Sequence, residues 1–262
     1  MSERRAAVIG HPISHSRSPE VFARLAAAYK IPLRYDAIDV DPTQLETTLA
    51  SWKTDDAFVG CNVTLPHKTR ALALADRVEP VARAIGAANV LTRVDGALVA
   101  DNTDVAGIED ALAAHGVSLA GAYVAILGAG GAARAVAAAA RRNGAAGLAI
   151  AARTPARAEE LAQDFAAVAC SLRDVPVSTL YVNATPVGMM GQPQLSLLPA
   201  NAPRDAVAFD LVYTPALTPF LLDAAARGMR TVQGTAMFYA QAAATFARWF
   251  GVQPDLHEMV QA

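Results

Sequence analysis

Short apolar runs alternate with longer, alanine-rich segments along almost the whole chain. Runs such as Ala6–Gly10 and Tyr123–Leu127 are small or apolar, which is typical of strands in a parallel sheet covered on both faces. The segments between these runs have the length and apolar spacing of helices. Because the alternation occurs on both sides of residue 103, we predict two α/β units.

The same pattern predicts where the elements lie. Strands are expected at 6–10, 33–40, 58–63, 90–91, 123–127, 147–152, 180–184, 207–212 and 228–234. Helices are expected at 19–29, 42–52, from about 68, at 79–85, at 105–115, from the glycines to 143, and at 237–250. Ser18 and Pro19 are expected to start the first helix, as its N-cap and its first residue. Asp95-Gly96 predicts a tight hairpin turn.

Composition narrows the classes of function. The 262 residues are 53% hydrophobic and 18% charged with a net charge of −2, so neither nucleic acid nor an anionic membrane surface is an expected partner. The opening residues are too short for a signal peptide, and no run approaches the ~20 apolar residues that span a bilayer, so a soluble, cytoplasmic protein is expected. Cys61 and Cys170 fit small buried side chains better than a disulfide framework. The five histidines are scattered, and no metal site is expected.

The stretch that follows Leu127 has the pattern G-x-G-x-x-A. Gly128 permits a tight turn, Gly130 lets the backbone approach a pyrophosphate, and Ala133 allows close packing of helix on strand. The N-terminus of the next helix offers N–H groups and a positive dipole end to phosphates. Because the pattern follows a strand and opens a helix, it favours dinucleotide binding over a structural turn.

The end of the next predicted strand distinguishes NAD from NADP. An NAD-binding domain carries an acidic residue there, which holds the ribose 2′-hydroxyl. This chain has Arg153, Thr154 and Arg157 instead, and two guanidinium groups with a hydroxyl suit a 2′-phosphate. NADP is therefore the predicted cofactor, and two surface arginines at a helix start are the alternative.

Polar residues gather where other predicted strands end, which is the edge where open α/β sheets bind ligands. Asn62, Thr64 and Lys68 lie at the C-terminal end of one such strand, and a lysine in the first turn of a helix is unfavourable for the helix dipole. That position favours a functional lysine over a solvated surface one. Ser14 and Ser16 fit a small anion or polyol site, or equally a solvated loop.

Three further segments are rich in polar or turn residues. Residues 101–104 hold more polar side chains than one helix cap requires. The strand endings at 183–189 and 210–215 lie where a nicotinamide ring would be placed.

Several of these segments form a joint pattern, namely Ser14-His-Ser16-Arg-Ser-Pro19, Asn62-Val-Thr64-Leu-Pro-His-Lys68, Gly86-Ala-Ala-Asn89, Asp101-Asn-Thr-Asp104, Gly128-Ala-Gly-Gly-Ala132 and Asn183-Ala-Thr185. Tyr213 and Gln241 extend the pattern, with Gly234 between them. In this order the motifs are those of shikimate dehydrogenases, which the chain resembles over nearly its whole length. It departs from the family at His11, where Asn is frequent, at Ala100, where Gly is frequent, and at Ala152, which replaces the Asn of the Asn-Arg-Thr cofactor motif.

The resemblance implies an α/β fold with an N-terminal substrate-binding domain, residues 1–103, and a Rossmann-type NADP-binding domain, residues 104–236. A C-terminal helix at 237–262 is expected to pack back on the first domain. The implied activity is the NADPH-dependent, reversible reduction of 3-dehydroshikimate to shikimate in chorismate and aromatic amino-acid biosynthesis. Such a reduction requires a proton for the developing alkoxide, which a lysine oriented by a carboxylate can deliver.

The resemblance also assigns individual residues. Lys68 and Asp104 are the implied catalytic pair. The implied substrate-binding residues are Ser14, Ser16, Asn62, Thr64, Asn89, Tyr213 and Gln241. The implied cofactor-binding residues are Gly128, Ala129, Gly130, Gly131, Ala132, Arg153, Thr154, Arg157, Thr185, Met189, Leu211 and Gly234.

Two alternatives remain at this point. The first is a quinate/shikimate dehydrogenase, or a paralogue that acts on a related hydroxy-acid. The second is a catalytically silent NADP-binding module, since a fold alone does not assign a function. A silent module would not need Lys68 together with Asp104. A small-molecule substrate and a monomeric or homodimeric state are expected.

Overall fold

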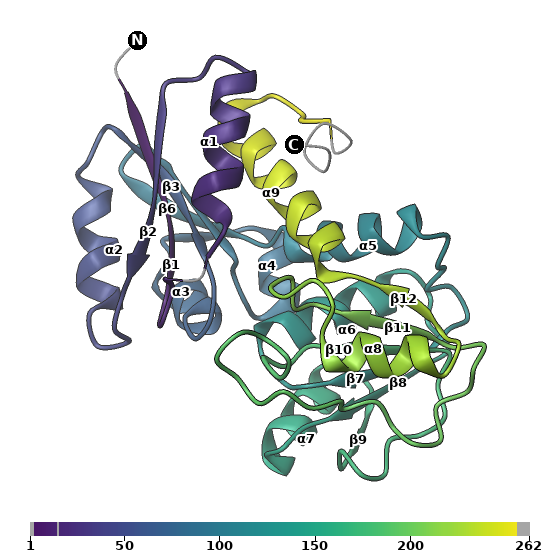
Figure 1. The fold of residues 1–262 in the computed structure, drawn as a ribbon. Coiled ribbons are helices and arrows are strands. Elements are labelled where there is room, and N and C mark those ends of the chain that lie inside the picture. The colour runs from purple at the N-terminus through teal and green to yellow at the C-terminus, as the bar shows by residue number, and fades with distance from the viewer. Residues whose placement is uncertain (1–2, 15, 256–262) are drawn as a thin grey trace. The chain divides into compact units, whose positions relative to one another are not determined.

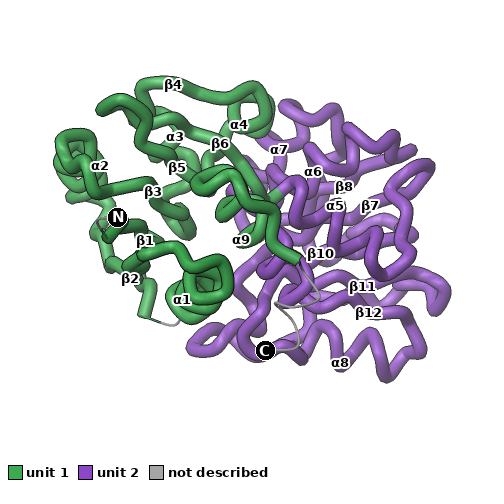
Figure 2. The backbone as a smooth tube through the Cα atoms, turned by 90° about the horizontal axis from the view of Figure 1, so that it is seen from above, with its two compact units in different colours: residues 1–104, 241–262 green, residues 105–240 purple. Residues whose placement is uncertain are grey.

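The computed structural model describes residues 3–14 and 16–255 of the chain. The chain divides into two compact units, residues 1–104 with 241–262 and residues 105–240 (Figure 2). In the described residues each unit contains a six-stranded sheet, which confirms the predicted α/β class. His15 and residues 256–262 of the expected C-terminal helix lie outside the described residues.

The first unit has a mixed sheet in the order β2-β1-β3-β5-β6-β4. Its strands are β1 Arg4–Gly10, β2 Leu33–Asp39, β3 Phe58–Val63, β4 Arg77–Val78, β5 Val90–Val94 and β6 Ala97–Asp101. Strand β1 pairs in parallel with β2 and β3, whereas β5 is antiparallel to β3 and β6. The predicted hairpin joins β5 to β6, and both turn residues have positive φ, 53° at Asp95 and 77° at Gly96.

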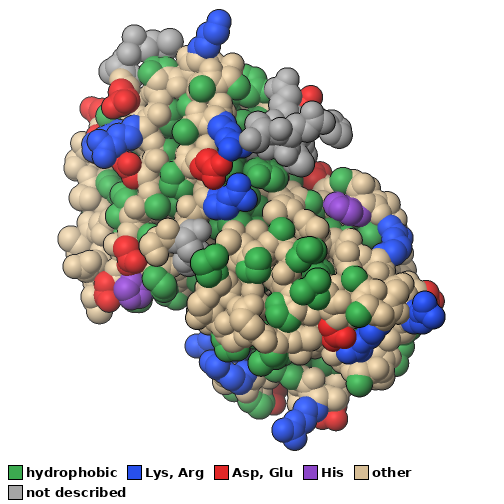
Figure 3. Space-filling view, viewed as in Figure 1, with side chains coloured by type: hydrophobic (Ala, Val, Ile, Leu, Met, Phe, Trp, Pro, Cys, Tyr) green, Lys and Arg blue, Asp and Glu red, His purple; other side chains and the backbone are tan. Residues whose placement is uncertain are grey.

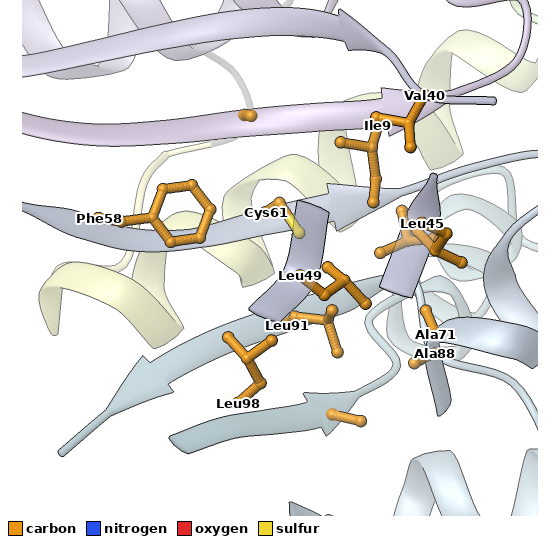
Figure 4. Close-up of a cluster of buried hydrophobic side chains, with 13 residues drawn as sticks. Ile9, Val40, Leu45, Leu49, Phe58, Cys61, Ala71, Ala88, Leu91 and Leu98 are labelled. Atoms are coloured by element: carbon orange, nitrogen blue, oxygen red, sulfur yellow. The ribbon is translucent and has the colours of Figure 1, made fainter. Parts of the chain in front are cut away.

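The helices of the first unit pack on this sheet. They are α1 Ser18–Ala28, α2 Leu45–Lys53, α3 Lys68–Leu74, α4 Pro80–Ile85 and the later turns of α9 Gly234–Phe250. Figure 4 shows Leu45 and Leu49 of α2 directed toward Ile9, Leu91 and Leu98 of the strands, and all five are almost fully buried. This cluster is one core of the unit.

Helix α9 completes a second core in the same unit, beside α1 (Figure 1). Phe22 of α1 stacks on Tyr35 of β2 with ring centroids 4.1 Å apart. Phe246 and Trp249 of α9 close over Phe22, at 6.3 and 5.5 Å between centroids. Gly60 makes room for this contact, because a Cβ there would lie 2.8 Å from Trp249 Nε1.

The second unit has an all-parallel sheet in the order β12-β11-β10-β7-β8-β9. Its strands are β7 Tyr123–Leu127, β8 Gly147–Ala151, β9 Val168–Cys170, β10 Leu180–Asn183, β11 Val207–Asp210 and β12 Arg230–Val232. Its helices are α5 Asp104–Ala114, α6 Gly131–Arg142, α7 Pro155–Asp164 and α8 Pro219–Ala226, with the first turns of α9. Read from β9, this is the strand order of a Rossmann fold, and the order reverses between β7 and β10, where such folds bind dinucleotides.

Three predicted helix starts are wrong. Ser18 is not an N-cap but lies in the first turn of α1, where its N–H donates to Ser16 Oγ at 3.3 Å. Helix α2 begins at Leu45, because the Asp41 carboxylate accepts from the N–H and the hydroxyl of Thr43 at 2.8 and 2.6 Å and closes a turn there. Helix α9 begins at Gly234 instead of residue 237.

The expectations drawn from composition concern the two cysteines, the surface charges and membrane-spanning segments. Cys61 is buried, as expected, whereas Cys170 is only half-buried, and both are free thiols. Basic and acidic side chains are interspersed over the face shown in Figure 3. Within the described residues, no helix combines the length and the apolar character needed to cross a bilayer.

Candidate active site

The first unit brings the predicted catalytic pair into contact. Lys68 is the first residue of α3 and Asp104 is the first residue of α5. Lys68 Nζ lies 2.5 Å from Asp104 Oδ2, and the two side chains are only 14% and 5% exposed. The carboxylate therefore offsets the unfavourable place of a lysine at a helix start, and the largely buried setting strengthens the attraction between the two charges.

Asn89 holds the carboxylate of this pair from the other side. Its Nδ2 donates to Asp104 Oδ1 at 2.8 Å and to Thr103 Oγ1 at 2.9 Å, while its Oδ1 accepts from the Thr103 N–H at 2.7 Å. Asn102 Oδ1 accepts from the Asp104 N–H at 2.9 Å and so caps α5. Asn102 therefore caps the helix, whereas the next two residues, Thr103 and Asp104, form hydrogen bonds with Asn89.

Asn62 sits in a second buried network. Its Oδ1 accepts from the Tyr35 hydroxyl at 2.8 Å, and its Nδ2 donates to Thr245 Oγ1 at 3.1 Å. Thr245 Oγ1 also donates to the Gln241 carbonyl at 2.9 Å and lies 3.2 Å from Thr103 Oγ1. Sequence reasoning missed Tyr35 and Thr245. For Thr245 a signal existed, since a spacing of four on a helix places it on the same face as Gln241.

Ser14 and Ser16 lie on the loop between β1 and α1, at the carboxyl end of the sheet. The loop is anchored by Asp39, whose Oδ2 accepts from the Ile13 N–H at 3.3 Å and whose Oδ1 lies 2.6 Å from His11 Nδ1. The hydrogen bond that His11 donates to the Asp39 carboxylate raises the pKa of His11. His11 thus helps to hold this loop.

Thr64 follows the neighbouring strand β3, and its N–H donates to the Ile9 carbonyl at 2.9 Å. The first unit thus contains Ser14, Ser16, Asn62, Thr64, Lys68, Asn89, Asp104 and Gln241. Tyr213 belongs to the second unit, where its ring stacks on Phe238 with centroids 4.2 Å apart. No group of three His, Cys, Asp or Glu side chains in the described residues is arranged to hold a metal ion.

The glycine turn of the second unit fits a dinucleotide. Gly128 has φ +121°, and a Cβ there would lie 2.8 Å from the Ala184 carbonyl oxygen, so the fold itself requires glycine. Gly130 is different, because its φ is −98° and a Cβ there would meet no protein atom within 4 Å. The space in front of Gly130 is open, at the N-terminus of α6, which is where a pyrophosphate would approach. Ala129, Gly131 and Ala132 complete this turn and the first residues of α6.

This difference gives a prediction. Gly130→Ala should weaken NADPH binding about tenfold or more, because an added methyl group in a close contact typically costs about 1–3 kcal/mol. Its thermal midpoint should fall little, since the backbone is compatible with alanine and only the N-cap preference for glycine is lost. Gly128→Ala is the contrasting variant and should lose thermal stability as well. NADPH fluorescence titration and thermal unfolding separate the two, and an unchanged affinity in Gly130→Ala would refute the placement.

The residues that follow β8 are free to bind an anion. Arg153, Thr154 and Arg157 are all exposed at the start of α7, and Thr154 occupies its N-cap position without a side-chain bond. Neither guanidinium has an ion-pair partner among the described residues. By contrast, Arg134 of α6 is committed to Glu160 and Asp164 of α7. The two free arginines suit a 2′-phosphate, so the second unit has groups for both phosphate-bearing parts of NADP.

The remaining predicted cofactor residues lie where β10 and β11 end. Thr185 donates its hydroxyl to Asn183 Oδ1 at 2.6 Å, and the Leu211 N–H donates to the Asn183 carbonyl at 3.0 Å. Met189 lies half-buried on the same loop as Thr185. Gly234 lets α9 start against the end of β11, because a Cβ there would lie 2.8 Å from the Asp210 carbonyl oxygen.

Comparisons with known proteins agree with this geometry. Residues 8–91 match the model of the shikimate dehydrogenase substrate binding domain, and residues 111–183 match that of shikimate / quinate 5-dehydrogenase. Shikimate dehydrogenase (NADP(+)) from Methylobacterium radiotolerans is 41% identical, over 98% of this chain and 96% of its own length. The enzyme of the same name from Dinoroseobacter shibae is 43% identical, over 98% and 95%.

A solved structure is equally similar. Shikimate 5-dehydrogenase from Thermus thermophilus, in complex with NADP(H) and shikimate, is 40% identical with a TM-score of 0.89. The match covers 98% of this chain and 97% of that one. The chain therefore belongs to the shikimate dehydrogenase family.

Proposed function

We propose that this chain catalyses the NADPH-dependent, reversible reduction of 3-dehydroshikimate to shikimate, with Lys68 and Asp104 as its catalytic pair. The observation that carries the assignment is the contact of 2.5 Å between these two side chains, in the unit that contains the match to the substrate binding domain. NADP is the cofactor, as it is of the named relatives, and it supplies the hydride when bound.

The protein's own groups handle the proton. The Lys68 ammonium donates a proton to the oxygen that becomes an alkoxide during reduction, and the neutral amine takes that proton back in the reverse direction. An ionised Asp104 can only accept hydrogen bonds, so it holds the Lys68 ammonium in one direction. Asn89 fixes the second carboxylate oxygen, so that Asp104 cannot rotate away from the lysine.

Substrate binding is assigned to the polar groups of the first unit, with Tyr213 a predicted substrate residue as well. Ser16 Oγ accepts from the Ser18 N–H, which leaves its hydroxyl proton available for an acceptor such as a carboxylate. We assign Ser14 and Ser16 to the substrate carboxylate on this ground and on the family likeness. Asn62 and Asn89 are each held by two buried partners, so their amides are fixed before a substrate arrives.

Two expectations stay predictions that rest on the sequence. We infer a cytoplasmic location from the biosynthetic role of the family. A monomeric or homodimeric state is expected, and sedimentation of the purified chain decides between them.

The reaction is tested by adding shikimate or quinate to the chain with NADP⁺ and following the NADPH that forms. We expect shikimate to be much the better substrate, because quinate carries an extra hydroxyl on a tetrahedral carbon beside its carboxylate. Comparable kcat/KM values for the two acids would favour a quinate/shikimate dehydrogenase. A chain that binds NADPH but oxidises neither acid would be a silent module.

Ser16→Gly should lower kcat/KM for shikimate about tenfold, which corresponds to the loss of one hydrogen bond to a charged group. The ratio of kcat/KM for shikimate to kcat/KM for quinate should also fall, because removal of the serine side chain makes space for the extra hydroxyl of quinate. Ser16→Ala is the matched control, since it removes the same donor but keeps the Cβ. A Ser16→Gly enzyme with unchanged selectivity would place the substrate carboxylate elsewhere.

A further inference from the structure

The second unit contains a buried carboxylate that the proposed chemistry does not use. Asp210 ends strand β11 and has no exposed surface. Its Oδ1 accepts from Asn183 Nδ2 at 3.0 Å and from the Val212 N–H at 2.9 Å, and its Oδ2 accepts from the Thr218 hydroxyl at 2.5 Å. No lysine or arginine of the described chain forms an ion pair with it. Because a buried charge without a counter-ion is costly, its presence at this position requires an explanation.

The carboxylate determines how the neighbouring amide is oriented. Since an ionised Asp210 can only accept, Asn183 must present its NH₂ group to it and turn its Oδ1 the other way. That oxygen accepts from the N–H and the hydroxyl of Thr185 at 3.1 and 2.6 Å. The Asn183 NH₂ also donates to the Val187 carbonyl at 3.1 Å, and Thr185 Oγ1 accepts from the Val187 N–H at the same distance. The charge of Asp210 therefore determines the direction of the hydrogen bonds in the turn that follows β10.

The same carboxylate also fixes the chain that follows β11. Its bond to the Val212 N–H holds residues 211–213, and Thr218 connects it to the first turn of α8 by accepting from the Leu221 N–H at 3.3 Å. The turn after β10 meets the start of α8 at Gly188, where φ is +92° and a Cβ would lie 3.1 Å from Thr218 Cβ. Asp210 thus joins both loops that carry the predicted cofactor residues at the ends of β10 and β11.

We propose that Asp210 is a positioning residue for the cofactor, whose ionised carboxylate shapes loops 184–189 and 211–213 so that they hold the nicotinamide half of NADP. The inference rests on the proposed function, which places the nicotinamide at these strand ends. Asp210 acts through the loops, because protein atoms enclose it completely. Thr185 acts in the same way, since its hydroxyl is directed to Asn183.

Protonation of Asp210 should loosen this arrangement. A protonated Oδ2 can donate to the Thr218 hydroxyl only if that hydroxyl turns and gives up the bond that it donates to Asp210, so at least one of the existing bonds is lost. Burial raises the pKa of Asp210 to about 6, although its three hydrogen bonds oppose the shift. Burial alone raises this pKa, the donors Asn183, Val212 and Thr218 lower it, and no charged group of the described elements contributes. Affinity for NADPH should therefore fall as the pH drops through about 6.

Asp210→Asn tests the proposal. The amide removes the charge, and its NH₂ group forces the Thr218 hydroxyl to accept where it now donates, so the dissociation constant of NADPH should rise about tenfold or more at pH 7.5. Shikimate binding in the absence of cofactor should change much less, because all the predicted substrate residues except Tyr213 of loop 211–213 lie in the first unit. Tyr181→Phe is the matched control, since it removes a different buried hydrogen bond, to the Ser178 N–H at 2.9 Å, from the same sheet. That variant should lose stability and keep its NADPH affinity.

The pH dependence separates a positioning role from a merely structural one. The 2′-phosphate of NADPH also titrates near pH 6, but it does so with every variant. Between pH 7.5 and 5, wild type should lose more NADPH affinity than Asp210→Asn, and equal losses would overturn the proposal. A folded Asp210→Asn chain that binds NADPH with normal affinity at pH 7.5 would also overturn the proposal.

A second variant can test the role of Asp210 if Asp210→Asn does not fold. Thr218→Val retains the carboxylate and removes a donor that lowers the pKa of Asp210, so the pH step in NADPH affinity should move to higher pH. An unmoved step would contradict the inference. All these readouts measure NADPH binding. A wild-type chain that binds NADPH without oxidising shikimate would therefore reject the proposed reaction and leave the role of Asp210 to be judged separately.

Discussion

Lys68→Ala should lower kcat by roughly 10²–10⁴-fold, the usual loss when a positioned acid–base group is removed. Shikimate affinity should change much less, because the ammonium is needed mainly when negative charge develops on the substrate oxygen. Asp104→Asn should lose rate as well, since the amide can no longer hold the ammonium by charge. Steady-state kinetics in both directions, with shikimate binding measured separately, check these results.

Lys53→Ala is the matched control for this prediction. Lys53 also stands in a helix of the first unit and also pairs with an aspartate, with its Nζ 2.6 Å from Asp76 Oδ1. That pair is more exposed, at 30% and 38%, and contributes at most about 1 kcal/mol to stability. Its loss should leave kcat unchanged. A Lys68→Ala enzyme with normal kcat would remove Lys68 from the mechanism.

Arg153→Ala should weaken NADPH binding by about 10–100-fold, as expected when a charge-assisted contact to a phosphate is lost. NADH binding should hardly change, because NADH lacks the 2′-phosphate that the guanidinium would contact. The double variant with Arg157→Ala should show a larger loss for NADPH and still none for NADH. Binding of both cofactors by fluorescence titration gives the comparison directly.

Arg204→Ala provides the control, since Arg204 is another exposed arginine of the second unit but precedes β11, at the amino ends of the parallel strands and so opposite the turn after β8. It should bind both cofactors as the wild type does. If Arg153→Ala instead lost affinity for NADPH and NADH equally, the guanidinium would support the fold of the loop and would not select the cofactor.

Periodicity and local chemistry predicted most of the second unit. The apolar run at 123–127, the glycines after it and the helix to Arg142 lie where the sequence placed them, because each depends on neighbouring residues only. The hairpin turn at Asp95-Gly96 could also be predicted, since few sequences suit a two-residue turn with positive φ at both positions. The short strands β4 and β9, of two and three residues, give no periodic signal and were not predicted.

What the sequence did not disclose depends on partners that are distant along the chain. Asn89 could be placed in the site, but not its bonds to Thr103 and Asp104, which only the meeting of β5 and β6 creates. The bond between Asn183 and Asp210 joins two strand ends 27 residues apart. At 42–44, local chemistry misled the prediction, because Asp41 bonds to Thr43 more favourably than a helix would allow.

Helix α9 sets the order in which the two units can be completed during translation. The second unit is one continuous segment, residues 105–240, and all of it is made before the later turns of α9. The first unit begins earlier but lacks Phe246 and Trp249 against Phe22 until synthesis has passed residue 249. Domains generally fold as units while the chain emerges, so the second unit should fold first. A nascent chain halted after residue 240 would then carry one finished unit and one with uncovered aromatic rings, which is the kind of surface that chaperones bind.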